Sequence, residues 1–394
     1  MKSEDIFASY KDNIMPTYNK TPVIFVKGKG SRLWDIKGKA YLDFFPGWGV
    51  GSVGHCHPKV MQGIRDQVGK LIFIPNNYYH PFQARLAEEL IRWSFPGKVF
   101  FANSGAEANE GAIKLARKSG ARSGKFEIIT FQNAFHGRTL ATLAATGQKK
   151  YQDGFLPMPE GFRQVSFNDT AAFRSALNDK TAAVMLELIQ GEGGLNVATK
   201  DFVLEIRRVC DERKLLLIVD EVQTGIGRTG SMFCYQNYGI TPDIMTLAKA
   251  LGGGMPIGAM VAKREIADLL TPGMHASTFG GGPVVCKASL GVFKAIRQDK
   301  MLQNCLKMGE YFKDKLRSLK ESSPLIKDVR GVGLMLGFEL NVPGRQLVEK
   351  CLERGLLINC THERVIRLMP ALNISKSDID KCLKIIEQSL KECS

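Results

Sequence analysis

The sequence predicts an α/β protein, with a large domain built on a mostly parallel sheet and a smaller α+β domain. Three observations support this fold class. Through the middle of the chain, compact apolar runs alternate with amphipathic stretches, which is typical of parallel strands covered by helices on both faces. Near the start, shorter apolar runs are broken by Gly-Lys turns. Beyond about residue 290, long amphipathic stretches precede several apolar runs.

The first expected elements are an antiparallel meander and two helices. Residues 23–45 contain short apolar runs separated by Gly-Lys turns, as expected of strands joined by hairpins. Residues 57–71 predict a helix with Pro58 in its first turn, where proline is favoured. Residues 80–93 have the apolar spacing of a second amphipathic helix.

The middle of the chain predicts a buried sheet. Its expected strands are residues 98–103, 126–131, 182–189, 214–221 and 243–249. Helical stretches at 106–120 and 200–214 lie between them. Because strands this apolar are separated by helices, we expect a mostly parallel sheet that is covered on both faces.

Three segments follow from this pattern. Residues 1–57 form an N-terminal segment that we expect to pack with the small domain, and residues 58–290 form the large domain. Residues 291–394 form the small α+β domain, which contains long amphipathic helices and a final helix. Its apolar runs are residues 328–340, 355–360 and 364–372.

Composition places the chain among ordinary globular proteins. It has 394 residues, of which 44% are hydrophobic and 24% charged. No apolar run reaches the roughly 18 residues that a membrane helix needs, and the opening "MKSEDIFASYKDN" has acids where a signal peptide needs basic and apolar residues. The nine cysteines are scattered without a CxxC pair, which argues against disulfides and a zinc ribbon. We therefore expect a cytoplasmic protein.

The net charge of +15 raises a nucleic-acid binder or a non-catalytic scaffold as an alternative. The basic residues are interleaved with acids, as in residues 313–322, and no basic block with interspersed aromatics occurs. Such a surface is compatible with small anionic substrates and cofactors. We therefore expect no nucleic-acid partner and no membrane partner.

Three short motifs do not support metal or nucleotide binding. His55, Cys56 and His57 are adjacent in sequence, so they cannot all face one ion, and no partner cluster follows. Residues 49–54 match GxGxxG, but no acid stands about 20 residues further on. Residues 120–126 resemble a P-loop but lack its spacing and its Ser or Thr.

Candidate functional residues follow several predicted strands, where ligands of parallel α/β sheets bind. The small residues Ser104, Gly105 and Ala106 open a helix, whose N-terminal N–H groups suit a phosphate. Asp220 and Lys249 stand at the ends of two other strands. Taken singly, Asp220 is also consistent with a capping role and Lys249 with a lysine that extends toward solvent.

Together with Phe135, His136 and Arg138, which follow another strand, these residues indicate pyridoxal phosphate chemistry. A desolvated lysine has a lowered pKa and is a usable nucleophile and base. A buried acid keeps the pyridine nitrogen protonated, so the ring acts as an electron sink. The glycines after Lys249 let the backbone bend close to a cofactor.

Longer blocks are more specific than any single residue. The most specific are "DEVQTGIGRTG" and "AKALGGGMPIGA", supported by "FFANSGAEANEGAIKLAR", "AFHGRTLATLAATG", "IQGEGG" and "HASTFGG". These blocks resemble the class III, ornithine-type aminotransferases of the fold-type I pyridoxal phosphate enzymes, and the match runs nearly end to end. The resemblance implies a homodimer with shared active sites. It also implies ping-pong transfer of the δ-amino group of N-acetylornithine to 2-oxoglutarate in arginine biosynthesis.

The resemblance also implies a role for each cofactor contact. Lys249 would bond covalently to pyridoxal 5'-phosphate and move the proton, and Asp220 would pair with the pyridine nitrogen. The other implied contacts are Gln223 at the ring hydroxyl, Phe135 stacked on the ring, and Ser104, Gly105 and Ala106 at the phosphate, joined by Thr278 from the neighbouring subunit.

The implied substrate contacts centre on two arginines. Arg138 would bind the distal carboxylate, and Arg367 the α-carboxylate of glutamate. Glu192 would pair with Arg367 while acetylornithine occupies the site. Ser277 completes the expected substrate-binding set, and no metal is expected.

Several positions depart from the family pattern. Trp48 and Gly51 lie in "FFPGWGVGSVGH", near the expected substrate entrance. Leu188 replaces a usual proline, and Gly282 replaces a usual asparagine. Trp48 and Gly51 leave the amine donor open among acetylornithine, ornithine, succinylornithine, acetyl-lysine and 4-aminobutyrate.

Overall fold

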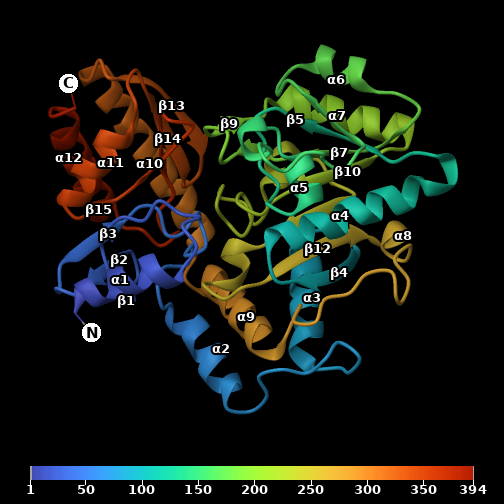
Figure 1. Ribbon diagram of the computed structural model, residues 1–394, viewed down its shortest axis with the longest axis horizontal. Coiled ribbons are helices and arrows are strands. Elements are labelled where there is room, and N and C mark those ends of the chain that lie inside the picture. The colour runs from blue at the N-terminus through green and yellow to red at the C-terminus, as the bar shows by residue number, and fades with distance from the viewer. Residues whose placement is uncertain (1, 394) are drawn as a thin grey trace.

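The computed structural model describes residues 2–393. Its largest sheet has seven strands in the order β4-β12-β11-β10-β7-β5-β6 (Figure 1). These are β4 (Gly97–Ala102), β5 (Glu127–Phe131), β6 (Phe162–Val165), β7 (Thr181–Leu186), β10 (Leu216–Asp220), β11 (Ile244–Leu247) and β12 (Gly258–Lys263). β10 runs parallel to β7 and β11, and β5 runs parallel to β6 and β7, whereas β12 is antiparallel to both of its neighbours. The mostly parallel sheet expected from the sequence is therefore confirmed.

The sheet differs from the sequence-based expectation at three places. β6 is half polar and β12 follows a run of glycines, so neither stands out as an apolar run bounded by turns. The strand expected at 243–249 ends at Leu247. Lys249 instead begins the 3-10 helix η4 (Lys249–Gly252), because its φ of 45° is left-handed and incompatible with a strand.

Helices cover both faces of this sheet. Ile218 of β10 belongs to the core that contains Leu115 of α4 (Gly105–Gly120). Its neighbour Leu217 belongs to the core that contains Phe202 of α7 (Lys200–Arg213). Successive strand residues point to opposite faces, so α4 and α7 lie on opposite sides of the sheet. The shorter helices of this body are α5 (Leu140–Ala145), α6 (Thr170–Ala176) and α8 (Arg264–Ala267).

Three helices pack together beside β4. They are α2 (Pro58–Val68), α3 (Pro81–Trp93) and α9 (Pro283–Gln298). α2 and α3 form where the sequence predicts helices, and each begins at a proline. The histidine before each proline, His57 or His80, accepts a hydrogen bond from a first-turn N–H. These caps satisfy donors that a helix end leaves without intrahelical partners.

Strands from both ends of the chain lie together on the other side of the molecule (Figure 1). The meander of β1 (Phe25–Lys29), β2 (Arg32–Asp35) and β3 (Ala40–Asp43) is extended by β15 (Leu356–Leu357), which runs parallel to β3. A second sheet has the order β13-β14-β17-β16. Its strands are β13 (Ile326–Val332), β14 (Met335–Leu340), β17 (Val365–Leu368) and β16 (Asn359–Thr361). The accompanying helices are α10 (Met301–Ser322), α11 (Arg345–Glu353) and α12 (Lys376–Leu390).

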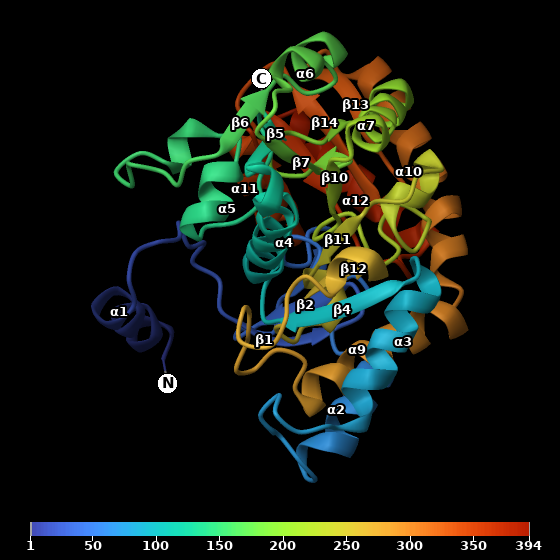
Figure 2. The same ribbon diagram turned by 90° about the vertical axis from the view of Figure 1, so that its right-hand side faces the viewer.

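The domain boundaries at residues 57 and 290 stay predictions. Residue 290 lies inside α9, so this helix continues across the second boundary. A further helix, α1 (Ser3–Asn13), is not expected from the sequence; it has no buried residue and projects from the body in Figure 2. Among residues 2–393, no helix combines the length and apolar character needed to span a bilayer. All nine cysteines are free thiols.

Arg228 joins three parts of the chain. It follows β10 and is fully buried. Its Nη1 donates to the carbonyls of Leu334 and Pro370, and its Nη2 donates to Ser52 Oγ at 2.7 Å. Burial lowers the pKa of its guanidinium to about 10. Arg228 thus links the segment after Asp220 to both the N-terminal and the C-terminal segments.

Candidate active site

Most of the predicted site residues meet at one cavity of about 250 Å³. It lies at the carboxyl ends of the parallel strands β5, β7 and β10, beside the start of α4. The predicted residues that line it are Gly105, Ala106, Phe135, Arg138, Glu192, Asp220, Gln223 and Lys249. Asn109, His136 and Glu187 line it as well.

Lys249 lies among acidic side chains in this cavity. Burial lowers the pKa of its amino group, although the negative charges of Glu192 and Asp220 oppose that shift. A lysine with a lowered pKa is neutral in a larger fraction of molecules near pH 7. Lys249 is therefore suited to nucleophilic attack and to proton transfer.

Asp220 is held by three donors. Its Oδ2 accepts hydrogen bonds from Asn109 Nδ2 and is 2.8 Å from His136 Nδ1, and its Oδ1 accepts from the Val222 N–H at 3.0 Å. The carboxyl group is 3% exposed, so these contacts fix its orientation away from bulk water. A second bond joins Asn109 Nδ2 to the His136 carbonyl at 2.7 Å. Asn109 was missed in the sequence, where its one signal is a polar residue on the buried face of α4.

The start of α4 supplies small residues and backbone N–H groups. Ser104 Oγ accepts a hydrogen bond from the Glu107 N–H at 3.2 Å, so the Ser104 hydroxyl caps the N-terminus of α4. Gly105 and Ala106 form the first turn and face the cavity. First-turn N–H groups have no intrahelical partner and favour an anion.

Phe135 and Arg138 lie on the loop after β5. The Phe135 N–H donates to Glu187 Oε1 at 2.8 Å, which fixes the backbone beneath the ring. The Arg138 guanidinium is 5.5 Å from the Phe135 ring centre and 4.0 Å from that of Tyr151. Because Arg138 is exposed, it can meet a carboxylate without first breaking a buried ion pair.

Arg367 is fully buried behind Glu192. Its Nη1 donates to Glu192 Oε1 at 2.6 Å and to Gln223 Oε1 at 3.2 Å. Its Nη2 donates to Asn359 Oδ1 at 2.8 Å, and the Phe45 ring lies 4.8 Å from the guanidinium carbon. Burial raises the pKa of Glu192, but Arg367, together with Lys249 and Gln223, holds that pKa below its ordinary value.

Glu187 is a buried acid that the sequence reasoning missed. Its carboxylate accepts the Phe135 N–H and the Gly191 N–H, at 2.8 and 3.2 Å. Burial raises the pKa of Glu187 to about 7, and Asp220 also raises it. Glu187 thereby ties the loop under Phe135 to the loop that carries Glu192.

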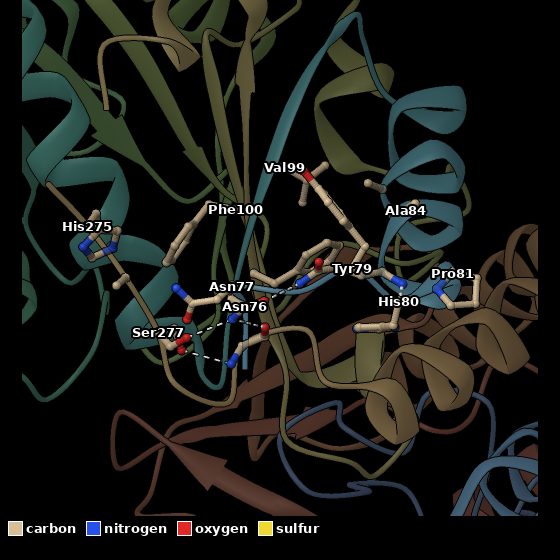
Figure 3. Close-up of a pocket in the computed structure, with 15 residues that line it drawn as sticks. Asn76, Asn77, Tyr79, His80, Pro81, Ala84, Val99, Phe100, His275 and Ser277 are labelled. Carbon is tan, nitrogen blue, oxygen red and sulfur yellow. Dashed lines mark hydrogen bonds between the residues drawn. The ribbon is translucent and has the colours of Figure 1, made fainter. Parts of the chain in front are cut away.

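Ser277 and Thr278 lie outside this cavity. Ser277 lines a second cavity of about 750 Å³, together with Asn76, His80 and His275 (Figure 3). Its Oγ accepts hydrogen bonds from Asn103 Nδ2 and from the Gly280 N–H. Thr278 is exposed beside it. Within one chain, the structure does not bring these two residues to Lys249.

The positions that depart from the family pattern do not line the Lys249 cavity. Trp48 is about half exposed, has a left-handed φ of 56° and packs edge-on against Phe45 at 5.6 Å. Gly51 lies so close to Pro46 that an added Cβ would come within 2.8 Å of it. Leu188 is fully buried, and Gly282 caps α9.

The histidines of the "GHCHP" stretch face different partners. His55 Nε2 lies 2.7 Å from Asp43, and His57 Nε2 lies 3.1 Å from Asp299. Within residues 2–393, no three His, Cys, Asp or Glu side chains are grouped as a metal site would require. Each histidine therefore has a local carboxylate partner of its own.

The residues of the Lys249 cavity fit a phosphorylated pyridine cofactor. A lysine with a lowered pKa, an oriented acid, an aromatic ring and a helix start surround one space. The buried Asn109 Oδ1 and His136 Nε2 have no hydrogen-bond partner in the protein. These two polar atoms beside Asp220 are therefore available to a ligand. This donor set matches the chemistry of pyridoxal phosphate.

Comparison with known proteins identifies the family. Residues 14–390 match the model of Aminotransferase class-III, and the chain belongs to this family. It is 49% identical to the acetylornithine aminotransferase of Methanocaldococcus jannaschii, with 100% of this chain and 99% of that protein covered. The corresponding protein of Caldanaerobacter subterraneus is 50% identical over 97% of this chain and 98% of its own length.

Solved structures share the fold. An ornithine aminotransferase from Toxoplasma gondii, described with partial occupancy of PLP at its active site, has a TM-score of 0.96 and 32% identity. That match covers 99% of this chain and 94% of the other. Acetylornithine aminotransferase from Elizabethkingia anophelis has a TM-score of 0.89 and 31% identity, with both chains fully covered.

Glu221 is a buried acid next to Asp220, and the effect of burial on its pKa can be tested by experiment. It is 1% exposed, accepts the Tyr235 N–H at 2.8 Å and contacts Thr224 Oγ1 at 2.6 Å. Burial raises its pKa from the ordinary 4.5 to about 7. The unfolded chain therefore loses this proton first, and ionisation lowers stability as pH rises from about 4.5 to about 7.

We expect Glu221→Gln to become more stable than the parent as pH rises, because glutamine keeps the shape without the charge. The gain is small at pH 5 and reaches at most about 3 kcal/mol at pH 8. Thermal unfolding at both values measures it. Glu205→Gln is the control: hydrogen bonds from Arg208 lower the pKa of Glu205, so its effect on stability changes mainly below about pH 4.5 and stays nearly constant between pH 5 and pH 8. For Glu221→Gln, a stability difference from the parent that does not change between pH 5 and pH 8 would contradict the prediction.

Proposed function

We propose that this chain is a pyridoxal phosphate-dependent aminotransferase that uses N2-acetyl-L-ornithine. It transfers the δ-amino group to 2-oxoglutarate, giving N-acetyl-L-glutamate 5-semialdehyde and L-glutamate, in the arginine biosynthesis of the cytoplasm. The observation that carries the proposal is the arginine arrangement at one cavity. Arg367 is covered by Glu192, whereas Arg138 is exposed. The relatives that match the whole chain support the same donor.

Each residue of the cavity has a role in this proposal. Bound pyridoxal phosphate supplies an electron sink for the carbon that carries the amino group. Lys249 takes and returns the proton at that carbon, which its lowered pKa favours near neutral pH. Asp220, oriented by Asn109 and His136, balances a positive charge at the pyridine nitrogen. Phe135 would cover the ring of the bound cofactor, and Gln223 would hydrogen-bond to the ring hydroxyl.

Two unlike substrates must use the same cavity. Glutamate has a carboxylate beside its reacting amino group, whereas the δ-carbon of acetylornithine has none. An uncovered Arg367 would attract the α-carboxylate of acetylornithine and present the wrong end of that substrate. Glu192 neutralises Arg367 in that half-reaction and moves away when glutamate or 2-oxoglutarate arrives. Arg138 binds the remaining carboxylate of either substrate, because its planar guanidinium suits a bidentate pair.

A panel of amine donors tests the donor assignment. The panel contains acetylornithine, ornithine, succinylornithine, acetyl-lysine and 4-aminobutyrate, each assayed with 2-oxoglutarate. We expect the highest kcat/KM for acetylornithine, the donor that the relatives matching the whole chain support. A clear preference for another donor would overturn this assignment but leave the aminotransferase class intact.

Glu192→Ala tests the covering of Arg367. Removing the carboxylate leaves Arg367 uncovered, which favours glutamate's α-amine over acetylornithine's δ-amine. A charge-assisted pair of about 1.5–3 kcal/mol would shift the ratio of the two half-reaction rates by roughly 10- to 150-fold. Single-turnover kinetics of each half-reaction, followed by cofactor absorbance, measure the shift.

Arg138→Ala is the comparison variant for that experiment. We expect it to slow both half-reactions, because each substrate uses Arg138. An unchanged ratio in Glu192→Ala would refute the covering role. Loss of only the glutamate half-reaction in Arg138→Ala would show that the two arginines have the opposite assignments.

The proposal includes a homodimer in which Thr278 completes the phosphate site of the other subunit. Thr278 is exposed beside the 750 Å³ cavity and does not line the Lys249 cavity. Several large apolar side chains of the same region are exposed, as expected of a surface that a second copy covers. They are Ile72, Phe73, Tyr78, Tyr79 and Phe279.

Mixing two inactive variants tests this sharing. Lys249→Ala lacks the reacting amine, and Thr278→Asp places a negative charge at the phosphate. If each site uses Lys249 of one subunit and Thr278 of the other, a mixed dimer has one intact site, and activity returns on mixing. Mass spectrometry of the native dimer verifies that subunits exchange. No recovery of activity despite exchange would indicate sites made from a single chain.

A further inference from the structure

Side chains of the β13-β14-β17-β16 sheet, called the C-terminal sheet below, bind the loop of residues 191–195 that carries Glu192. Its carbonyl groups at residues 191, 192 and 194 each accept a hydrogen bond from a side chain of that sheet. The bonds are Arg367 Nη1 to Gly191 O at 2.9 Å, Thr361 Oγ1 to Glu192 O at 2.8 Å, and Arg330 Nε to Gly194 O at 2.8 Å. The sheet thus binds the loop's backbone as well as the Glu192 carboxylate.

Residues that follow β7 hold the same loop at its base. The Gly191 N–H donates to Glu187 Oε2 at 3.2 Å, and the Leu195 N–H donates to the Gln190 carbonyl at 2.9 Å. The short strands β8 (Ile189–Gln190) and β9 (Asn196–Val197) pair across its base. The loop backbone is held at both ends and at Glu192. The Glu192 side chain can therefore rotate while the main chain stays in place.

Strand β16 holds both partners of the ion pair. Asn359 Oδ1 accepts from Arg367 Nη2, and Thr361, two residues along, donates to the Glu192 carbonyl. Side chains two residues apart in a strand point to the same face. Thr361 is 7% exposed, so a Glu192 carbonyl that lost this donor would be left poorly solvated. The turn that follows has left-handed φ values at His362 and Glu363, a strained geometry that surrounding contacts must maintain.

We propose that Thr361 is a positioning residue for substrate choice, which holds the Glu192 backbone so that the carboxylate covers Arg367 by side-chain rotation alone. This inference rests on the proposed function. Without the Thr361 hydroxyl, the Glu192 backbone samples more conformations, and forming the ion pair then costs additional conformational entropy. Arg367 is consequently uncovered more often, and the preference moves toward glutamate's α-amine.

Thr361→Val removes the hydroxyl while preserving the shape, and Thr361→Ser retains the hydroxyl. From the net value of one hydrogen bond, we expect Thr361→Val to move the half-reaction ratio toward glutamate by about 2- to 10-fold. Thr361→Ser should stay close to the parent. In the Glu192→Ala background, Thr361→Val should have no further effect, because residues that act through each other give non-additive changes.

Hydrogen exchange of the holoenzyme supplies a readout that does not depend on turnover. We expect Thr361→Val, but not Thr361→Ser, to speed exchange of the Gly191 and Leu195 amides, while exchange in the central strand β10 stays unchanged. Thr361→Ala replaces the valine variant if the latter does not fold.

The outcomes separate this inference from the function on which it rests. If Glu192→Ala leaves the ratio unchanged, the covering of Arg367 itself is refuted. If Glu192→Ala shifts the ratio but Thr361→Val changes neither the ratio nor the exchange, only the role of Thr361 is overturned. If Thr361→Val shifts the half-reaction ratio equally in the parent and in the Glu192→Ala background, the role of Thr361 is also overturned, because Thr361 would then not act through Glu192.

Discussion

The burial of Lys249 among acidic groups is the constraint on which the rest of the site depends. An amine taken out of water loses hydration, and that loss lowers its pKa, while Glu192 and Asp220 restore part of the stability of its charged form. Asp220 is buried and Glu192 is half-buried, so each needs partners of its own. Asp220 has Asn109, His136 and a backbone N–H, and Glu192 has Arg367. One reactive amine thus requires a network that reaches from α4 to the C-terminal sheet.

That network forms only if the seven-stranded sheet and the C-terminal sheet are held in a fixed relative position. Arg367 lies on β17, far in sequence from the loop of Glu192, yet their contact distance is 2.6 Å. Arg228 binds the segment after Asp220 to carbonyls of the C-terminal segment and to Ser52. Thr361 and Arg330 bind the Glu192 loop to the same sheet. Because a guanidinium–carboxylate pair is directional, these backbone contacts decide whether the pair can form at all.

Much of the site could be predicted because its residues follow recognisable strands. Gly105, Phe135 and Asp220 stand after apolar runs, and parallel strands bring their carboxyl ends to one edge of a sheet. Asn109 and Glu187 could not be predicted in the same way. Asn109 is one polar residue on the buried face of α4, and Glu187 is one within an apolar segment. The meaning of each depends on a partner elsewhere, the Asp220 carboxylate or the Phe135 N–H. Strand β12 was missed because it follows a run of glycines and does not stand out as an apolar run bounded by turns.

The sequence by itself determined the α/β class, the parallel strands and the family, because apolar periodicity and the blocks around Asp220 and Lys249 are local properties of the chain. Only the tertiary structure decided that Lys249 leaves its strand with a left-handed φ, and that Glu192 stands between Arg367 and the cavity. It also decided that Ser277 and Thr278 lie outside that cavity. These features depend on the distances between segments that are remote in sequence, and hydrophobic spacing does not encode such distances. They arise only when the sheets, helices and buried hydrogen bonds pack together.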